Sequence, residues 1–215
     1  MSHHSQLKSE QVLEICRLCP VIPVLEVERA EDAVPLAQAL LAGGLSVLEV
    51  TLRTADALKA ISAMATIKDV VVGAGTLRTP EDVRAAKQAG AAFGVSPGAT
   101  DSLLAACEAE DLPILPGAAT ASEVMALLEK GYTAQKFFPA EASGGQAALK
   151  SLGGPLPKAM FCPTGGITPQ TAKSYLSLKN VMCVGGSWIA PKDLVASKNW
   201  KEIESRAQLT SQLKE

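Results

Sequence analysis

A single (β/α)8 TIM barrel of the α/β class is the fold that this 215-residue sequence predicts, and three features indicate it. Short runs rich in Val and Ile alternate with Ala- and Leu-rich helical stretches. The ends of the runs follow one another at roughly 20 to 30 residues, enough for one loop, one helix and one strand, and no long linker interrupts them. Because parallel strands need a helical crossover at each step, eight such units predict a closed barrel that forms one domain over residues 1–215.

The predicted strands are short and mostly apolar. They are Val21–Val27, Val47–Leu52, Val70–Gly73, Ala92–Ser96, Pro113–Pro116, Ala134–Phe138, Ala159–Cys162 and Val181–Gly185. An open doubly wound sheet is the alternative fold. Against it, Gly73-Ala74-Gly75 lacks the third glycine of the dinucleotide-binding fingerprint, because Arg78 stands in its place.

The predicted helices carry recognisable start and stop signals. A capping hydroxyl precedes the first turn at Thr79, Thr120 and Thr168. A glycine stands where a helix ends at Gly43, Gly90 and Gly131. The helices predicted in this way include Glu31–Ala42, Pro80–Ala89, Ala121–Glu129 and Pro169–Leu178. An additional N-terminal helix over residues 7–18 is expected to close the bottom of the barrel, and residues 1–5 are expected to be disordered.

Composition and charge exclude several classes of partner. A formal net charge of −2 and the lack of any basic run argue against a nucleic-acid or anionic membrane surface. The longest charge-free apolar stretch, Ala33–Leu48, contains Pro35 and is too short to cross a bilayer. The N-terminus shows no basic segment followed by an apolar one, so we expect no secretory signal and a cytoplasmic location.

Cysteine and histidine usage narrows the chemistry. Cys16 and Cys19 have the C-x-x-C spacing of redox and zinc sites, but neither a preceding strand nor a second ligand pair accompanies them. We interpret them as two cysteines on a surface helix. The only histidines, His3 and His4, lie at the terminus, so proton transfers would fall to Glu, Asp, Lys, Tyr or water. A Ser-His-Asp site and a His-rich metal site are excluded.

Two charged residues lie in the predicted strand over residues 47–52 and just after it. Side chains alternate across a strand, so Glu49, Thr51 and Arg53 share the face that points into a barrel. Glu49 and Arg53 are therefore expected on one side near the top, where barrel enzymes hold their catalytic residues. The alternatives are a helical surface pair four residues apart or a purely structural ion pair.

Lys136 lies in another apolar strand, and the same alternation turns it inward together with Ala134 and Phe138. An amine at such a position loses hydration, and a nearby Arg53 would also disfavour its ammonium form. A free amine can attack a carbonyl group near neutral pH. The alternative is a lysine whose stem packs inside while its charged end reaches solvent.

Glycine pairs follow the last two predicted strands. Gly165-Gly166 precedes a helix, and Gly185-Gly186 precedes Ser187. Glycine lets backbone N–H groups approach a ligand closely, and a helix N-terminus attracts anions. Loops after the seventh and eighth strands form the usual phosphate site of such barrels, so these pairs predict phosphate binding. Tight turns without a ligand are the alternative.

With these segments the sequence resembles the family of 2-keto-3-deoxy-6-phosphogluconate (KDPG) and 4-hydroxy-2-oxoglutarate (KHG) aldolases. The resemblance runs from Val21 to Trp188, and the ends of the chain match poorly. Its most specific segments are residues 48–54, 72–76, 96–98, 136–141 and 161–167. The resemblance implies a class I aldolase, which needs neither a metal nor another cofactor because a protonated imine is the electron sink.

The same resemblance implies a role for each candidate residue. Lys136 would form the Schiff base with the C2 ketone, and Glu49 would be the general acid and base. The pyruvate carboxylate would be held by Arg53 and Thr76. Pro97 and Phe138 would wall the pocket, and Thr164 would contact the substrate near C4, which favours the gluconate-derived substrate. The 6-phosphate would be bound by Gly165, Gly166, Gly185, Gly186 and Ser187.

The expected substrate is thus a phosphorylated keto acid, cleaved to pyruvate and glyceraldehyde 3-phosphate, with KHG as a second substrate. A homotrimer is also implied by the resemblance. Two rival functions keep the phosphate loops but need no imine. One is another phosphate-binding barrel enzyme, an isomerase or synthase that uses Glu49 as base and Lys136 as a mere charge. The other is a non-catalytic barrel that binds a sugar phosphate.

Overall fold

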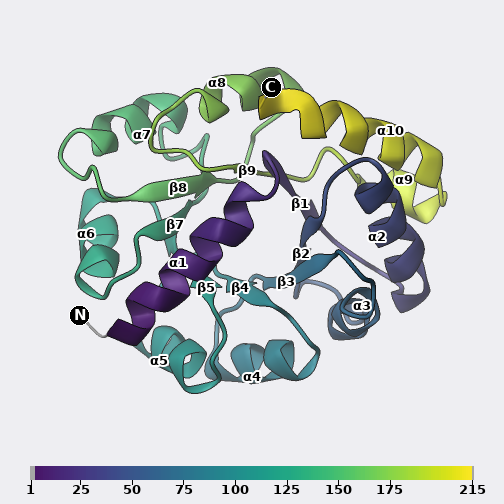
Figure 1. The fold of residues 1–215 in the computed structure, drawn as a ribbon, viewed down its shortest axis with the longest axis horizontal. Helices are drawn as coiled ribbons and strands as arrows, with labels where there is room; N and C mark the ends of the chain where they lie inside the picture. Colours follow the sequence, from purple (N-terminus) through teal and green to yellow (C-terminus); the bar gives the residue numbers. More distant parts are fainter. Residues whose placement is uncertain (1–2, 215) are drawn as a thin grey trace.

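A ring of parallel strands forms the centre of the molecule, and helices surround it (Figure 1). The structure is a computed structural model that describes residues 3–214. The strands are β1 (Val21–Leu25), β2 (Val47–Thr51), β3 (Val71–Gly75), β4 (Phe93–Val95), β5 (Ile114–Leu115), β6 (Gly117–Ala118), β7 (Ala134–Phe137), β8 (Met160–Pro163) and β9 (Val184–Gly186).

The hydrogen-bonded strands make two arcs that close on one another. One arc has the order β5-β4-β3-β2-β1-β9 and the other β6-β7-β8, and each pairing in them is parallel. β5 lies within the predicted fifth strand, Pro113–Pro116, and β6 follows its predicted end; Pro116, whose nitrogen has no hydrogen to donate, separates the two. Bridges from Phe161 to Val181 and from Thr164 to Gly185 join the far ends. The prediction of a closed (β/α)8 barrel is confirmed, and the open sheet is excluded.

The helices begin near the predicted positions. Thr79, Thr120 and Thr168 each accept a hydrogen bond from the backbone N–H three residues later, as the capping prediction requires. The helices are α1 (His3–Arg17), α2 (Ala33–Ala42), α3 (Ala57–Met64), α4 (Pro80–Gln88), α5 (Asp101–Ala109), α6 (Ala121–Glu129), α7 (Gly145–Gly153), α8 (Pro169–Leu176), α9 (Lys192–Ala196) and α10 (Trp200–Ser211), with short 3-10 turns at Ala30–Asp32 and Gln212–Lys214.

Several strand limits differ from the predicted ones by a few residues. β1 ends at Leu25 instead of Val27, and β3 continues to Gly75, two residues beyond the predicted end. β9 begins at Val184 because Val181 makes only an isolated bridge to Phe161. Local composition sets the presence of a strand, whereas its limits depend on the length of the neighbouring strand with which it pairs.

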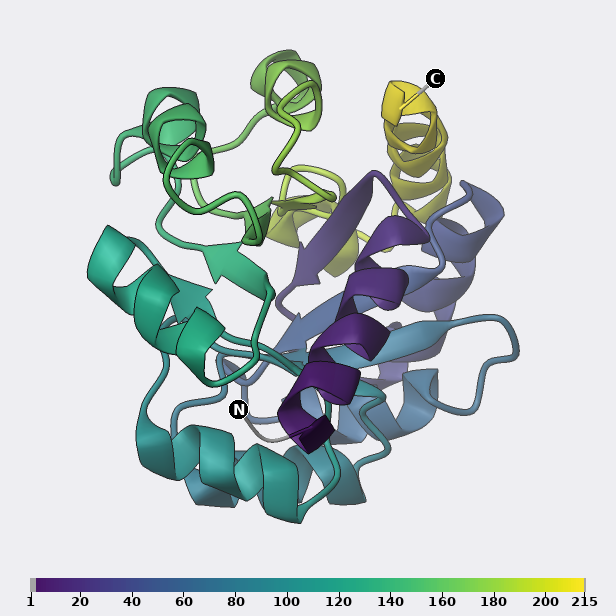
Figure 2. The ribbon, with the colours of Figure 1, turned by 60° about the vertical axis from the view of Figure 1, so that its left-hand side comes forward.

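Helix α1 lies across one end of the barrel (Figures 1 and 2). Ser9 Oγ accepts hydrogen bonds from the backbone N–H groups of Thr133 and Ala134, at 2.9 and 3.0 Å. These residues lie at the start of β7, so α1 closes the end at which the strands begin, as predicted. The open end of the barrel is therefore the one at which the strands finish.

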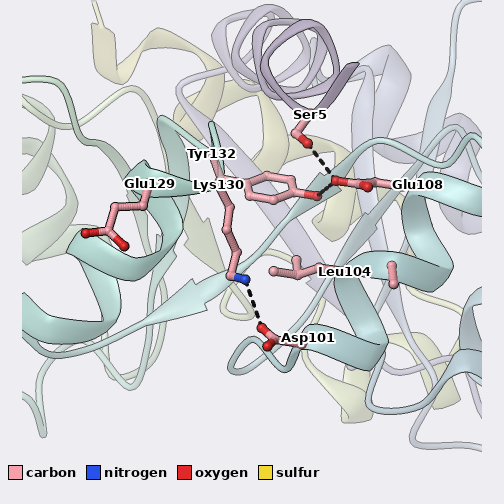
Figure 3. Close-up of a pocket in the computed structure, with 8 residues that line it drawn as sticks. Ser5, Asp101, Leu104, Glu108, Glu129, Lys130 and Tyr132 are labelled. Atoms are coloured by element: carbon pink, nitrogen blue, oxygen red, sulfur yellow. Dashed lines mark hydrogen bonds and ion pairs between the residues drawn. The ribbon is translucent and has the colours of Figure 1, made fainter. Parts of the chain in front are cut away.

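The helix also begins earlier than expected. It starts at His3, so the disordered segment predicted for residues 1–5 is helical from residue 3 onward, while residues 1 and 2 lie outside the described part. Ser5 explains the extension, because its Oγ donates to Glu108 of α5 at 2.6 Å (Figure 3). Tyr132 donates to the same carboxylate at 3.3 Å. This contact ties the first turn of α1 to the barrel.

The interpretation of Cys16 and Cys19 as surface residues was wrong. Their exposed fractions are 0% and 1%. The last turn of α1 and the segment after it pack against the barrel, so these thiols become part of its core. Both are free thiols, and within residues 3–214 no group of three or more His, Cys, Asp or Glu side chains could hold a metal ion. Nor does this part of the chain contain a helix long and apolar enough to cross a membrane.

Candidate active site

Lys136 and Glu49 meet inside the open end of the barrel. Lys136 comes from β7 and Glu49 from β2, 87 residues apart in the chain. Lys136 Nζ lies 3.1 Å from Glu49 Oε1, and the two residues are 6% and 4% exposed. The inward orientation that strand alternation predicts for both side chains is confirmed. At this distance a proton of the Lys136 ammonium group can pass to the Glu49 carboxylate without movement of either residue.

Glycine makes room for this pair. Gly75 ends β3, next to β2, and a Cβ atom at Gly75 would lie 2.3 Å from Glu49 Oε1. Gly117, the partner of Lys136 in the pairing of β6 with β7, packs as closely against the backbone of Pro97. Any larger side chain at Gly75 would displace the Glu49 carboxylate. Gly75 and Gly117 are thus required by the close packing around this site.

A cavity of about 250 Å³ opens above the pair. Seven of its lining residues are candidates from the sequence: Glu49, Arg53, Thr76, Pro97, Lys136, Phe138 and Thr164. The aromatic ring of Phe138 contributes a wall, with its centroid 5.4 Å from Lys136 Nζ. Val24 and Thr51 complete the lining and were not proposed as site residues. Strand alternation had already turned Thr51 inward, so that signal was present in the sequence.

Arg53 lines the cavity and pairs with an acidic residue that was not among the site candidates. Its guanidinium group lies 2.8 Å from Glu26 Oε1, and its side chain is 51% exposed. The carboxylate of Glu49 lies beside Lys136, while the Arg53 guanidinium group pairs with Glu26 in the lining of the same cavity. Glu26, which follows β1, was missed because no sequence pattern links it to residue 53.

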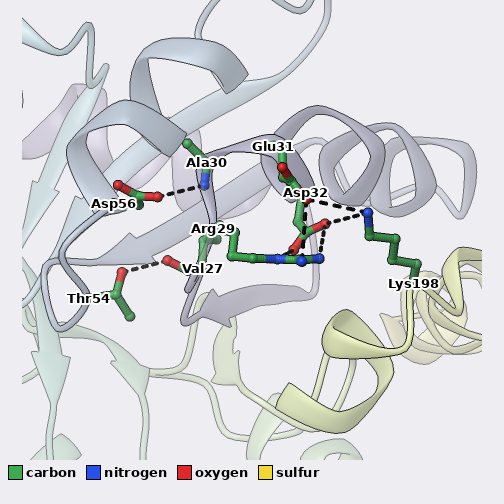
Figure 4. A network of polar contacts seen from close by, with 8 residues as sticks. All are labelled: Val27, Arg29, Ala30, Glu31, Asp32, Thr54, Asp56 and Lys198. Atoms are coloured by element: carbon green, nitrogen blue, oxygen red, sulfur yellow. Dashed lines mark hydrogen bonds and ion pairs between the residues drawn. The ribbon is translucent and has the colours of Figure 1, made fainter.

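A polar network holds the loop that follows β1 (Figure 4). Asp32 is buried and accepts hydrogen bonds from Arg29 at 3.0 and 3.2 Å. Thr54 donates to the backbone oxygen of Val27 at 2.6 Å, and Asp56 accepts from the N–H group of Ala30 at 3.1 Å. The loops that follow β1 and β2 are thereby fixed to each other at the mouth of the barrel.

The two predicted phosphate loops lie side by side. Gly165 and Gly166 follow β8 with φ angles of 105° and 78°, which side chains rarely allow. Gly185 of β9 packs so closely on Thr164 that a Cβ atom would lie 2.3 Å from its hydroxyl oxygen. Ser187 is exposed and lines a second cavity of about 320 Å³. Backbone N–H groups and a hydroxyl group are thus available near one another.

A parallel barrel with a buried amine and carboxylate at its open end defines the class of the protein. This is the architecture of α/β-barrel enzymes, which hold their reaction centre at the carboxyl ends of the strands. The two groups suit covalent catalysis on a carbonyl substrate with proton transfer.

Comparison with known proteins gives the family. Residues 12–206 match the KDPG and KHG aldolase family. A 2-dehydro-3-deoxy-phosphogluconate aldolase of Pseudoalteromonas atlantica is 50% identical over 190 residues, which are 88% of this chain and 88% of that protein. The chain therefore belongs to the KDPG and KHG aldolase family, and it is a lyase.

Two solved structures show the same fold. The KDPG aldolase of Legionella pneumophila, with pyruvate captured as a covalent carbinolamine intermediate, matches with a TM-score of 0.90 and 46% identity, over 93% of this chain and 97% of that one. The 2-keto-3-deoxy-6-phosphogluconate aldolase of Zymomonas mobilis with 3-phosphoglycerate matches with a TM-score of 0.90 and 45% identity, over 95% of this chain and 97% of that one.

Proposed function

We propose that Lys136 and Glu49 carry the aldol cleavage of KDPG to pyruvate and glyceraldehyde 3-phosphate, and of KHG to pyruvate and glyoxylate. The observation that carries this proposal is the buried contact of 3.1 Å between Lys136 Nζ and Glu49 Oε1 in the wall of the cavity. The carbinolamine of the Legionella aldolase supports covalent attachment of pyruvate to an amine.

The reaction begins with the transfer of a proton from Lys136 Nζ to Glu49. The free amine attacks the C2 ketone of the substrate and gives a carbinolamine. Glu49 then delivers a proton to the carbinolamine oxygen, and water leaves as the protonated imine forms. This step restores the carboxylate of Glu49 for the cleavage that follows.

Cleavage uses the imine as the electron acceptor. Glu49 takes the proton of the C4 hydroxyl group, the C3–C4 bond breaks, and its electron pair moves through C3 to the imine nitrogen. The aldehyde leaves, and Glu49 returns the proton to C3 of the remaining enamine, which restores the imine and the carboxylate. Water then hydrolyses the imine, which releases pyruvate and the amine of Lys136.

Binding of the two ends of the substrate completes the proposal. Arg53 and Thr76 hold the carboxylate, Pro97 and Phe138 wall the pocket, and Thr164 contacts the substrate near C4; these five residues line the cavity. The phosphate group is bound by Gly165, Gly166, Gly185, Gly186 and Ser187. The homotrimer that the resemblance implies and the cytoplasmic location expected from the N-terminal sequence belong to this proposal as well.

Trapping of the imine tests the function. Pyruvate with borohydride should leave a stable adduct, and peptide mapping should place it on Lys136, because reduction fixes the imine as a secondary amine. The same treatment without pyruvate is the control and should leave the protein unmodified. An adduct on a different lysine, or none, contradicts the Schiff-base assignment.

The phosphate loops are tested by comparing two substrates. Ser187→Ala should lower kcat/KM for KDPG. The loss of transition-state stabilisation should not exceed the free energy of one charged hydrogen bond, about 1.5–3 kcal/mol, because the backbone supplies the other donors. Gly165→Val should do more damage, since it blocks approach to the backbone at a positive φ angle. KHG, which has no phosphate group, should be cleaved comparatively well by both variants.

Thermal unfolding of each variant checks that it is folded. Equal losses on KDPG and KHG would mean that these residues serve folding alone, and the phosphate site would then lie elsewhere.

A further inference from the structure

Lys192 stands beside the phosphate loops, in a segment to which the sequence analysis assigned no function. It is the first residue of α9 and lines the second cavity together with Ser187, Trp188 and Glu26. Val24 lines both this cavity and the one that holds Lys136 and Glu49, so the two cavities are neighbours. A ligand that extends from Lys136 toward Ser187 approaches Lys192.

Glu26 links the cations of the two cavities. Its Oε1 lies 2.8 Å from Arg53 Nη1, and its Oε2 lies 2.5 Å from Lys192 Nζ. Lys192 also lies 3.3 Å from Glu28 Oε1. One carboxylate thus holds a cation at each side. Arg53 lines the cavity where the substrate carboxylate is proposed to bind, and Lys192 lines the one that Ser187 also lines.

Lys192 supplies the positive charge that the proposed phosphate donors lack. The donors proposed for the phosphate, which are backbone N–H groups and the hydroxyl group of Ser187, carry no formal charge. Glu26 also lines this cavity and would repel a phosphate dianion. Lys192 is the cation in the lining, and it neutralises that repulsion when its ammonium group lies between the carboxylate and the dianion.

We propose that Lys192 determines specificity for the phosphorylated substrate, by binding the phosphate group beside Ser187. The proposal rests on the phosphate site proposed above. When the substrate enters, the Lys192 ammonium group turns from Glu26 toward the phosphate, while Arg53 turns to the substrate carboxylate.

The properties of Lys192 fit this role. Hydrogen bonds to Glu26 and Glu28 raise the pKa of Lys192, so it remains an ammonium group at neutral pH. Its side chain is 63% exposed, so no packing has to break when it turns. An exposed cation is screened by salt, and its effect should therefore be moderate and should depend on ionic strength.

Lys192→Met tests the proposal, with Lys198→Met as a matched control. Lys198 is also an exposed lysine, just beyond the end of α9, but it pairs with Glu31 and Asp32 (Figure 4). Lys192→Met should lower kcat/KM for KDPG by about three- to tenfold at low salt and leave KHG within about twofold. Lys192→Arg should recover most of the kcat/KM for KDPG, and Lys198→Met should leave kcat/KM unchanged for both substrates.

Salt gives a second measurement. The ratio of kcat/KM for KDPG to that for KHG should fall with ionic strength in the wild type and much less in Lys192→Met, because the variant has lost the screened charge. Ser187→Ala, measured in parallel, separates this inference from the phosphate site itself.

Lys192→Met and Lys198→Met could have the same kcat/KM for both substrates while Ser187→Ala still lowers kcat/KM for KDPG selectively. In that case the phosphate site stands, and Lys192 only forms a surface ion pair. If Ser187→Ala and Lys192→Met both affect the two substrates equally, the phosphate site is misplaced and the inference fails with it.

Discussion

Replacement of Lys136 by arginine is expected to lower kcat for KDPG cleavage by roughly 10⁵- to 10⁶-fold, the scale on which loss of a covalent nucleophile acts in other enzymes. Arginine keeps the positive charge beside Glu49, but its guanidinium group stays protonated and does not form an imine. Turnover of purified protein at saturating substrate is the measurement, and mass spectrometry after pyruvate and borohydride should find no adduct.

The choice of arginine follows from burial. Lys136→Met would leave the carboxylate of Glu49 buried without a cation, at a cost of about 3–5 kcal/mol, so a loss of activity there could reflect unfolding. Comparison of the unfolding temperatures of the arginine variant and the wild type shows whether the fold is intact. A folded Lys136→Arg variant that retained activity within about 100-fold of the wild type would contradict the covalent mechanism.

Glu49→Gln is expected to lower kcat by roughly 10²- to 10⁴-fold, the usual effect of removing a general acid and base. The amide keeps the shape of the carboxyl group but cannot take a proton from Lys136 or from the C4 hydroxyl group. Pyruvate should still bind, and a reduced adduct should still form slowly. Steady-state kcat and the rate of adduct formation are the two measurements.

Glu81→Gln serves as the matched control for this variant, because Glu81 is an exposed residue of α4 that pairs with Arg84. It should leave kcat unchanged. A Glu49→Gln enzyme within a few-fold of the wild type would remove Glu49 from its proposed role.

Strand alternation predicted the centre of the site well. The positions of Lys136 and Glu49 depend on which face of a strand a residue occupies, and that is set by neighbouring residues in the chain. The same rule placed Arg53 at the mouth of the cavity. Each of these predictions required only a few consecutive residues, which is why the sequence sufficed.

Contacts between distant segments could not be predicted in this way. The pairing of Arg53 with Glu26 joins the ends of two strands, and nothing local distinguishes Glu26 from any other acidic residue. The burial of Cys16 depends on where α1 packs, which follows from the closed barrel and not from the helix itself. No role was predicted for Lys192 because its segment contains no recognisable motif.

The same contrast between local sequence signals and contacts of distant segments applies to the fold. Capping threonines predicted the starts of α4, α6 and α8, because a cap acts within one turn. The early start of α1 at His3 depends on Glu108, a partner that comes from elsewhere in the chain.

Closure of one end of the barrel by α1 has a consequence for the order of events in turnover. Residues of α1 such as Val12 and Cys16 are completely buried, so a molecule formed at the strand ends has no exit through the other side. Both products must then depart through the mouth by which the substrate arrived. Under the proposed mechanism the aldehyde is free once the C3–C4 bond breaks, while pyruvate is still attached to Lys136 at the base of the cavity. Release is therefore sequential, and the pyruvate-bearing enzyme, whose Lys136 amine is not free to attack a new substrate, is the form that accumulates when pyruvate is abundant.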